Sequence, residues 1–188
     1  MHEVESITIS SLSESDARAI GELLVRVWPK DNRPLDYRID QLFQRKIYSS
    51  EKQSQDPRSL LIRSGSRIMA HAAVMPRTVG TSQGDLTLLA LAHVCTDPDT
   101  RGQRLGQRIM QAVFALVDDG TFPFSLFQTT EQVKPFYLQL GACLAENSFI
   151  DSTNPNNPKS PFQDPVIMRY PNGEGWPEGT IDLRGPGY

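Results

Sequence analysis

Apolar residues recur at helical spacing in two stretches near the start of the chain. The first follows the polar residues 13–16, ends at Trp28-Pro29, and carries its apolar side chains at Ala17, Ile20, Leu23, Leu24 and Val27. The second follows Pro34 and carries Ile39, Leu42, Phe43 and Ile47. Each pattern predicts an amphipathic helix, and the first has acidic residues near its positive end. The polar residues 49–55 indicate a loop.

From Ser59 onward the helical spacing gives way to short apolar runs. Runs at 60–63, 68–79 and 86–96 are separated by turn residues at 64–65 and 80–85, which predicts an antiparallel meander of three strands. Later segments predict a helix at 105–117, a strand at 124–127, a helix at 136–140 and a strand at 143–150. This order predicts a mixed α/β (α+β) domain and not a doubly wound one.

The last part of the chain differs in kind. Residues 151–188 hold seven prolines and five glycines, which excludes long regular elements. They also hold apolar residues that a disordered tail would not need, such as Val166, Trp176 and Ile181. We therefore expect a last strand at 165–170, a domain covering 1–170, and an extended arm, 171–188, packed on that domain.

Composition narrows the function classes. The chain has 188 residues, 38% of them apolar, and a formal net charge of −3. The mildly acidic balance argues against a nucleic-acid-binding protein, and no apolar run is long enough to span a membrane. The polar, acidic N-terminal segment does not resemble a signal peptide, so we expect a cytoplasmic protein. Cys95 and Cys143 lack metal-ligand spacing, and we expect them to be buried free thiols.

Residues 96–108 are the segment most suggestive of chemistry. They join a predicted strand to a predicted helix and contain two glycines and three arginines, namely Arg101, Gly102, Arg104, Gly106 and Arg108. A glycine-bearing turn at a helix N-terminus exposes backbone N–H groups and positive charge, which suits a pyrophosphate. The alternative interpretation is an ordinary turn with solvated arginines.

Two motifs together resemble the GNAT (Gcn5-related N-acetyltransferase) superfamily. Residues 94–98 leading into Arg101-Gly102-Gln103-Arg104-Leu105-Gly106 are similar to its Arg/Gln-x-x-Gly-x-Gly/Ala acetyl-CoA motif. About 30 residues later, residues 135–142 resemble its second motif, an aromatic-Tyr pair followed by a glycine. The resemblance extends over roughly residues 7–170. It implies a mostly antiparallel sheet flanked by helices.

The resemblance also implies an activity. A GNAT enzyme transfers acetyl from acetyl-CoA to an amine, here that of a small molecule, directly within a ternary complex. It implies acetyl-CoA as co-substrate, no metal and the option of a homodimer, while the charge and hydropathy given above argue against a nucleic acid or membrane partner. By similarity, the cofactor-binding residues are Val94, Cys95, Thr96, Arg101, Gly102, Gln103, Arg104, Leu105, Gly106, Gln107 and Thr130. Arg104 and Thr130 depart from the family pattern, since the usual residues there are Gly and Asn.

Catalytic roles follow from the same resemblance. Tyr137 matches the tyrosine that gives a proton to the departing thiolate. Many relatives carry a glutamate base on the strand before the cofactor loop, where this chain has Leu88, Ala90 and Ala92. His93 and His71 are the remaining interior candidates for the base, although a lone histidine on an apolar strand is more often a hydrogen-bonded core residue. A water chain to bulk solvent is an equal alternative.

Two other functions fit the same residues. A non-catalytic acyl-CoA-binding or sensing module would need the loop but not Tyr137. An acyltransferase for longer acyl chains would differ in pocket depth, which no residue in the sequence reports. The arm from Trp176 to Tyr188 either closes the acceptor site or only covers an edge strand.

Overall fold

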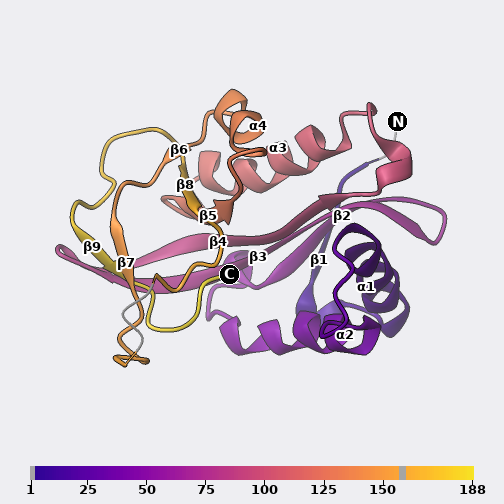
Figure 1. Ribbon diagram of the computed structural model, residues 1–188, viewed down its shortest axis with the longest axis horizontal. Coiled ribbons are helices and arrows are strands. Elements are labelled where there is room, and N and C mark those ends of the chain that lie inside the picture. Colours follow the sequence, from indigo (N-terminus) through magenta and orange to yellow (C-terminus); the bar gives the residue numbers. More distant parts are fainter. Residues whose placement is uncertain (1–2, 157–159) are drawn as a thin grey trace. The chain divides into compact units, whose positions relative to one another are not determined.

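The computed structural model describes residues 3–156 and 160–188, and Figure 1 shows their arrangement. The predicted fold class is confirmed, because helices flank an open, mostly antiparallel sheet. The helices are α1 (Glu14–Val27), α2 (Leu35–Gln44), α3 (Leu105–Asp118) and α4 (Lys134–Gln139), with 3-10 turns η1 (Ile9–Ser11), η2 (Arg45–Tyr48), η3 (Gln53–Gln55) and η4 (Pro98–Thr100). The strands are β1 (Glu5–Thr8), β2 (Arg58–Ser64), β3 (Arg67–Thr81), β4 (Gly84–Thr96), β5 (Ser125–Thr129), β6 (Cys143–Leu144), β7 (Ser148–Ile150), β8 (Val166–Tyr170) and β9 (Thr180–Asp182).

The strands follow the hydrogen-bonded order β1-β2-β3-β4-β5-β8-β6, and β9 pairs with both β3 and β7. The chain divides into two compact units. Unit 1 comprises residues 1–75 and 93–115, and unit 2 comprises residues 76–92 and 116–188. Strands β3 and β4 and helix α3 therefore contribute residues to both units.

Unit 1 is built on α1 and α2, which lie side by side (Figure 1). The Ser13 hydroxyl accepts a hydrogen bond from the Asp16 N–H at 3.1 Å and so caps α1. The inner face of α1 packs against apolar side chains of α2, β2, β3 and β4. This core contains Ala17, Ile20, Leu23, Leu24, Leu42, Leu61, Ile68 and Cys95. It holds the start of β3 and the end of β4 in place.

Unit 2 has its own core beneath the second half of the sheet. Strand β5 pairs with β4 in parallel only at Leu89 and Ala90, and with β8 in antiparallel along its whole length. The C-terminal segment adds β9, which pairs with β7 in parallel and meets β3 at Gly80. The core residues are Val79, Leu88, Leu126, Ala145, Phe149, Phe162, Ile181 and Leu183.

Several predictions of elements need correction. The four-residue β1 was not predicted, and the strand expected at 143–150 is two short strands with a break between them. Within the extended arm expected at 171–188 lies the short strand β9, which was not predicted. Ile47 is 77% exposed, because α2 ends at Gln44 and the 3-10 turn that follows changes the spacing. Both cysteines are free, but Cys143 is only partly buried.

Among the described residues, no helix is both long and apolar enough to cross a membrane. In the same residues, no group of three or more His, Cys, Asp or Glu side chains is placed to hold a metal ion.

Candidate functional site

The loop between β4 and α3 is anchored by Asp97, whose side chain is almost fully buried. Its carboxylate accepts hydrogen bonds from Arg67 Nε at 2.8 Å, from Arg26 Nη1 at 3.2 Å and from the Asp99 N–H at 3.1 Å. Its own N–H donates to the Met69 carbonyl at 2.8 Å. Burial alone would raise the pKa of Asp97, but these bonds and the two arginine charges hold it below its usual value. The carboxylate therefore stays charged and fixes the start of the loop.

The rest of the loop presents its backbone to solvent. Gly102 has φ +83° and Arg104 has φ +56°, a left-handed conformation that suits glycine better than arginine. The Arg104 carbonyl accepts the first bond of α3, from the Arg108 N–H at 3.1 Å. The N–H groups of residues 105–107, in the first turn of α3, precede this bond and have no intrahelical partner. Residues 101–104 are exposed, so the backbone N–H groups of the loop and of the helix end are accessible to solvent, an arrangement that suits an anion.

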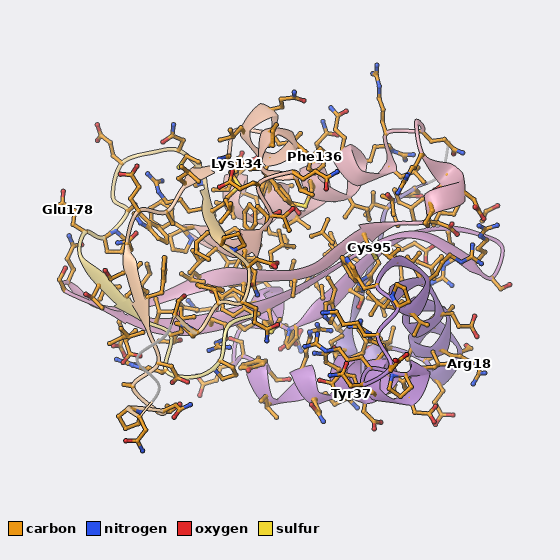
Figure 2. All side chains as sticks on the ribbon, in the orientation of Figure 1. Arg18, Tyr37, Cys95, Lys134, Phe136 and Glu178 are labelled. Carbon is orange, nitrogen blue, oxygen red and sulfur yellow. The ribbon has the colours of Figure 1, made fainter. Side chains whose placement is uncertain are left out.

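Strand β4 becomes irregular just before this loop. His93 has φ +54°, which interrupts the regular alternation of side chains along the strand. Because β4 pairs with β5 only at Leu89 and Ala90, residues 94–96 have no strand partner on that edge in the described chain. Their N–H and C=O groups can pair with an extended ligand. The Cys95 side chain instead lies in the core between β4 and α1 (Figure 2).

The His93 side chain contacts a buried arginine. Its Nδ1 lies 2.8 Å from Arg45 Nη2, and its ring lies 6.2 Å from the Trp28 ring, centroid to centroid. Arginine only donates, so Nδ1 accepts, and a neutral His93 carries its proton on Nε2. Burial and the positive charge of Arg45 hold the pKa of His93 well below its usual value. His93 is therefore a neutral imidazole with an N–H at Nε2.

His71, the second candidate for the base, is fully buried and hydrogen-bonded on both ring nitrogens. Nδ1 lies 3.2 Å from the His93 carbonyl oxygen and Nε2 lies 3.1 Å from Ser59 Oγ. The carbonyl requires a donor, so Nδ1 carries the proton and Nε2 accepts from the hydroxyl. Burial lowers the pKa of His71 to about 3. These contacts favour the core interpretation, in which His71 supports the backbone of His93.

Tyr137 and Thr130 belong to unit 2, on α4 and on the loop before it, whereas the other expected site residues belong to unit 1. Tyr137 is buried, and its ring lies 4.7 Å from that of Phe127 and 5.1 Å from that of Phe136. Figure 2 labels Lys134 and Phe136 near the start of α4. Pro135 occupies the first turn of this helix, where no N–H is needed. The Thr130 carbonyl accepts from the Lys134 N–H at 2.9 Å, so Thr130 helps to set the start of α4.

Sequence reasoning missed the polar residues on the buried side of α2 and η2. Arg38 and Arg45 are 2% and 6% exposed, although charged residues of a predicted surface helix are expected in solvent. A signal was present, because positions 38, 42 and 45 share one helix face and Leu42 was predicted to be buried on it.

Comparisons with known proteins agree with this arrangement. The family model described as "Acetyltransferase (GNAT) domain" matches residues 8–145. The GNAT family N-acetyltransferase YhbS from Escherichia coli, solved in complex with CoA, is similar with a TM-score of 0.65 and 15% identity, over 97% of this chain and 89% of that one. An acyl-CoA N-acyltransferase from Pseudomonas aeruginosa is similar with a TM-score of 0.60 and 12% identity, over 90% and 99%.

A glucosamine-6-phosphate N-acetyltransferase from Arabidopsis thaliana has a TM-score of 0.56 and 15% identity, over 75% of this chain and 90% of that one. Two other similar structures, from Kribbella flavida and Enterococcus faecalis, are longer, and this chain spans about a third of each. No curated protein matches the sequence. Because the family model covers well over half of the chain, this protein belongs to the GNAT acetyltransferase family and is an acyltransferase.

Proposed function

We propose that the protein is an acetyl-CoA-dependent N-acetyltransferase that moves acetyl to an amine of a small molecule, directly within a ternary complex. The observation that supports this proposal is that an open strand edge, a left-handed loop and a helix N-terminus follow one another along the chain from the end of β4. An unpaired strand edge at residues 94–96 leads straight into a loop in which Gly102 and Arg104 are left-handed, at the start of α3. Acyl-CoA binding is supported by family membership and by the CoA complex of the E. coli neighbour.

The residues of unit 1 account for donor binding. Backbone groups of residues 94–96 are suited to pair with the amide-bearing pantetheine arm as an added strand would. The loop N–H groups and the exposed side chains of Arg101 and Arg104 are suited to the pyrophosphate. An N–H near Cys95 is suited to polarise the thioester carbonyl. Cys95 itself takes no part as a nucleophile, because burial raises the pKa of its thiol to about 12.

Proton transfers complete the reaction. The amine nitrogen forms one bond to the acetyl carbon while the carbon–sulfur bond breaks, so one proton must leave the amine and one must reach the sulfur. We assign the second transfer to the Tyr137 hydroxyl, by its match to the family motif. The Arabidopsis neighbour is a glucosamine-6-phosphate N-acetyltransferase, so a small-molecule amine is an acceptor for an enzyme of this fold.

His93 acts as a hydrogen-bond donor in the proposed reaction and not as the base. Arg45 occupies its Nδ1, and its Nε2 already carries a proton, so the neutral ring has no lone pair to offer. We assign deprotonation of the amine to water. His93→Ala and His71→Ala should then leave the pH dependence of kcat/KM unmoved between pH 6 and 9, while a shifted limb in either variant would restore that histidine as the base.

Calorimetric titration with acetyl-CoA and CoA, followed by an amine panel with measurement of thiol release, tests the proposal. Micromolar binding with release of CoA by an amine supports an enzyme. Binding without release across the panel supports a sensing module, and absence of binding contradicts both. Palmitoyl-CoA in the same assay tests the interpretation as a longer-chain acyltransferase.

Tyr137→Phe tests the acid. We expect turnover to fall about 10- to 1000-fold with little change in acetyl-CoA affinity, because only the proton of the hydroxyl is removed. Tyr170→Phe is the matched control in the same unit, since the Tyr170 hydroxyl donates to Asp118 Oδ1 at 2.7 Å and is not part of the proposed site. Equal turnover in wild type and Tyr137→Phe would remove Tyr137 from the mechanism.

A further inference from the structure

One face of α2 and η2 carries two buried arginines and a partly buried glutamine of unit 1. Arg38, Gln41 and Arg45 are three and four positions apart, which puts them on the same side of the helix. Arg38 and Arg45 are more than nine-tenths buried. Arg38 Nη2 donates to the Trp28 carbonyl at 3.2 Å, and Arg45 Nη2 donates to His93 Nδ1 at 2.8 Å.

Each of these side chains has a buried polar atom without a hydrogen-bond partner. The atoms are Arg38 Nε, Gln41 Oε1 and Arg45 Nη1. Two are donors and one is an acceptor. Unpartnered buried polar groups are uncommon in native proteins, so three on one helix face require an explanation.

The two arginines also lack a counter-charge. Within residues 3–156 and 160–188, neither forms an ion pair with a carboxylate, whereas Arg26, Arg63 and Arg67 all do. Burial lowers the pKa of Arg45 to about 10, so it remains charged at neutral pH. A buried charge without a partner destabilises a fold. The stability of the fold therefore does not explain why these two arginines are buried without a carboxylate partner.

The position of the cluster connects it to the proposed reaction. Arg45 contacts His93, which directly precedes residues 94–96, the strand edge proposed to bind the acyl donor. The charges of Arg45, Arg38 and Arg33 all act on the His93 ring. The cluster thus combines positive donors with one acceptor oxygen, next to the proposed position of the thioester.

Resting on the proposed function, we infer that the acceptor is an amine that also carries an anionic group, a carboxylate or a phosphate, and that Arg45 and Arg38 bind this group. A guanidinium binds either anion with charge-assisted bonds, and Gln41 Oε1 is suited to an N–H of the same molecule. This assigns Arg45 as a substrate-binding residue that sets acceptor specificity.

Matched pairs of amines test the inference. Free amino acids are compared with their carboxamides, and O-phosphoethanolamine with ethanolamine, by thiol release with acetyl-CoA. We expect the anionic member of at least one pair to have a kcat/KM about 30-fold higher, the worth of one buried charge-assisted bond. The pair that shows the difference identifies carboxylate or phosphate. Equal rates within every pair would overturn the inference while leaving the enzyme intact.

Arg45→Met removes the charge and keeps a side chain of similar length. We expect the preference to fall to about one, with acetyl-CoA affinity unchanged, whereas Arg18→Met on the exposed side of α1 keeps it. The Tm of Arg45→Met should equal or exceed that of wild type, since an uncompensated buried charge is gone. A lower Tm together with an unchanged preference would show that Arg45 is only structural.

A binding measurement keeps the inference testable if no probe is acetylated. The chain has two tryptophans, and Trp176→Phe leaves Trp28, whose ring faces His93, as the reporter. Inorganic phosphate and acetate are titrated into this variant with CoA present. A saturable fluorescence change that Arg45→Met abolishes supports the inference, and no saturable change with either anion overturns it. Failure to bind acetyl-CoA, in contrast, contradicts the proposed function.

Discussion

Arg45 in unit 1 and Arg77 in unit 2 are equally hidden, each 6% exposed, but their surroundings differ. Arg77 donates to the carbonyls of Leu183 at 2.9 Å and Pro186 at 3.4 Å, and its guanidinium lies 5.2 Å from the centre of the Tyr188 ring. Arg45 has one bond, to a histidine nitrogen, and an unpartnered Nη1. The comparison teaches that a buried cation surrounded by backbone acceptors holds a segment in place, whereas one without them is suited to bind a ligand.

Arg77→Met should have the largest effect on stability. It leaves two backbone carbonyls of the C-terminal segment without this donor, so we expect a loss of about 3 kcal/mol in the free energy of unfolding. Urea denaturation of Arg77→Met and Arg45→Met, measured side by side, checks this, because the second variant should lose nothing. Equal losses would break the comparison.

His71 provides a second comparison with Arg45 within unit 1, because it is buried and both of its ring nitrogens are hydrogen-bonded. Its folded pKa of about 3 is below the unfolded value of about 6.5, so the unfolded state binds one more proton between these values. Stability should be full above about pH 6.5 and decline as the pH falls, by roughly 1.4 kcal/mol per pH unit from this group.

Urea denaturation of wild type and His71→Gln at pH 7, 6 and 5 measures that decline. In the variant, the slope of stability against pH should be smaller by about one proton. His93, which also has a lowered pKa, accounts for a part of the slope that should remain. Identical slopes in the two proteins would show that His71 is not buried in a neutral form.

Arg104 gives the smallest effect and concerns backbone strain instead of charge. Because its φ is +56°, Arg104→Gly should relieve strain and, after the entropy cost of glycine, raise stability by about 0.5 kcal/mol. Arg101→Gly is the matched control in the same loop, at φ −56°, and should lower stability by about as much. Thermal unfolding of both variants measures these changes. A change in Tm of the same sign in both variants would contradict the backbone strain at Arg104.

The sequence predicted the elements whose signals are local. The apolar face of α1 and the turns between β2, β3 and β4 each depend on a few neighbouring residues, and the structure contains both. β1 and β9 were missed because strands of three or four residues carry too short an alternation, and their pairing partners are distant in the sequence.

The proposed site likewise has features with a local sequence signal and features that depend on tertiary packing. The glycine and arginine pattern of the loop after β4 is local, and it predicted the exposed turn that the structure contains. The irregular backbone at His93 could not be predicted from the sequence, since a positive φ is uncommon at any residue other than glycine. The burial of Arg38 and Arg45 depends on how α2 packs against the rest of unit 1. From the sequence of one helix alone, charged residues are predicted to face solvent.

The burial of Cys95 provides a label for opening of the protein. Its thiol lies in the unit 1 core, and its pKa of about 12 keeps it protonated, so alkylating reagents cannot modify it until α1 separates from β4. Cys143, only partly buried, is more accessible to the same reagents. After Cys143 is replaced by serine, the rate of alkylation therefore reports how often this core opens under native conditions, with no probe introduced.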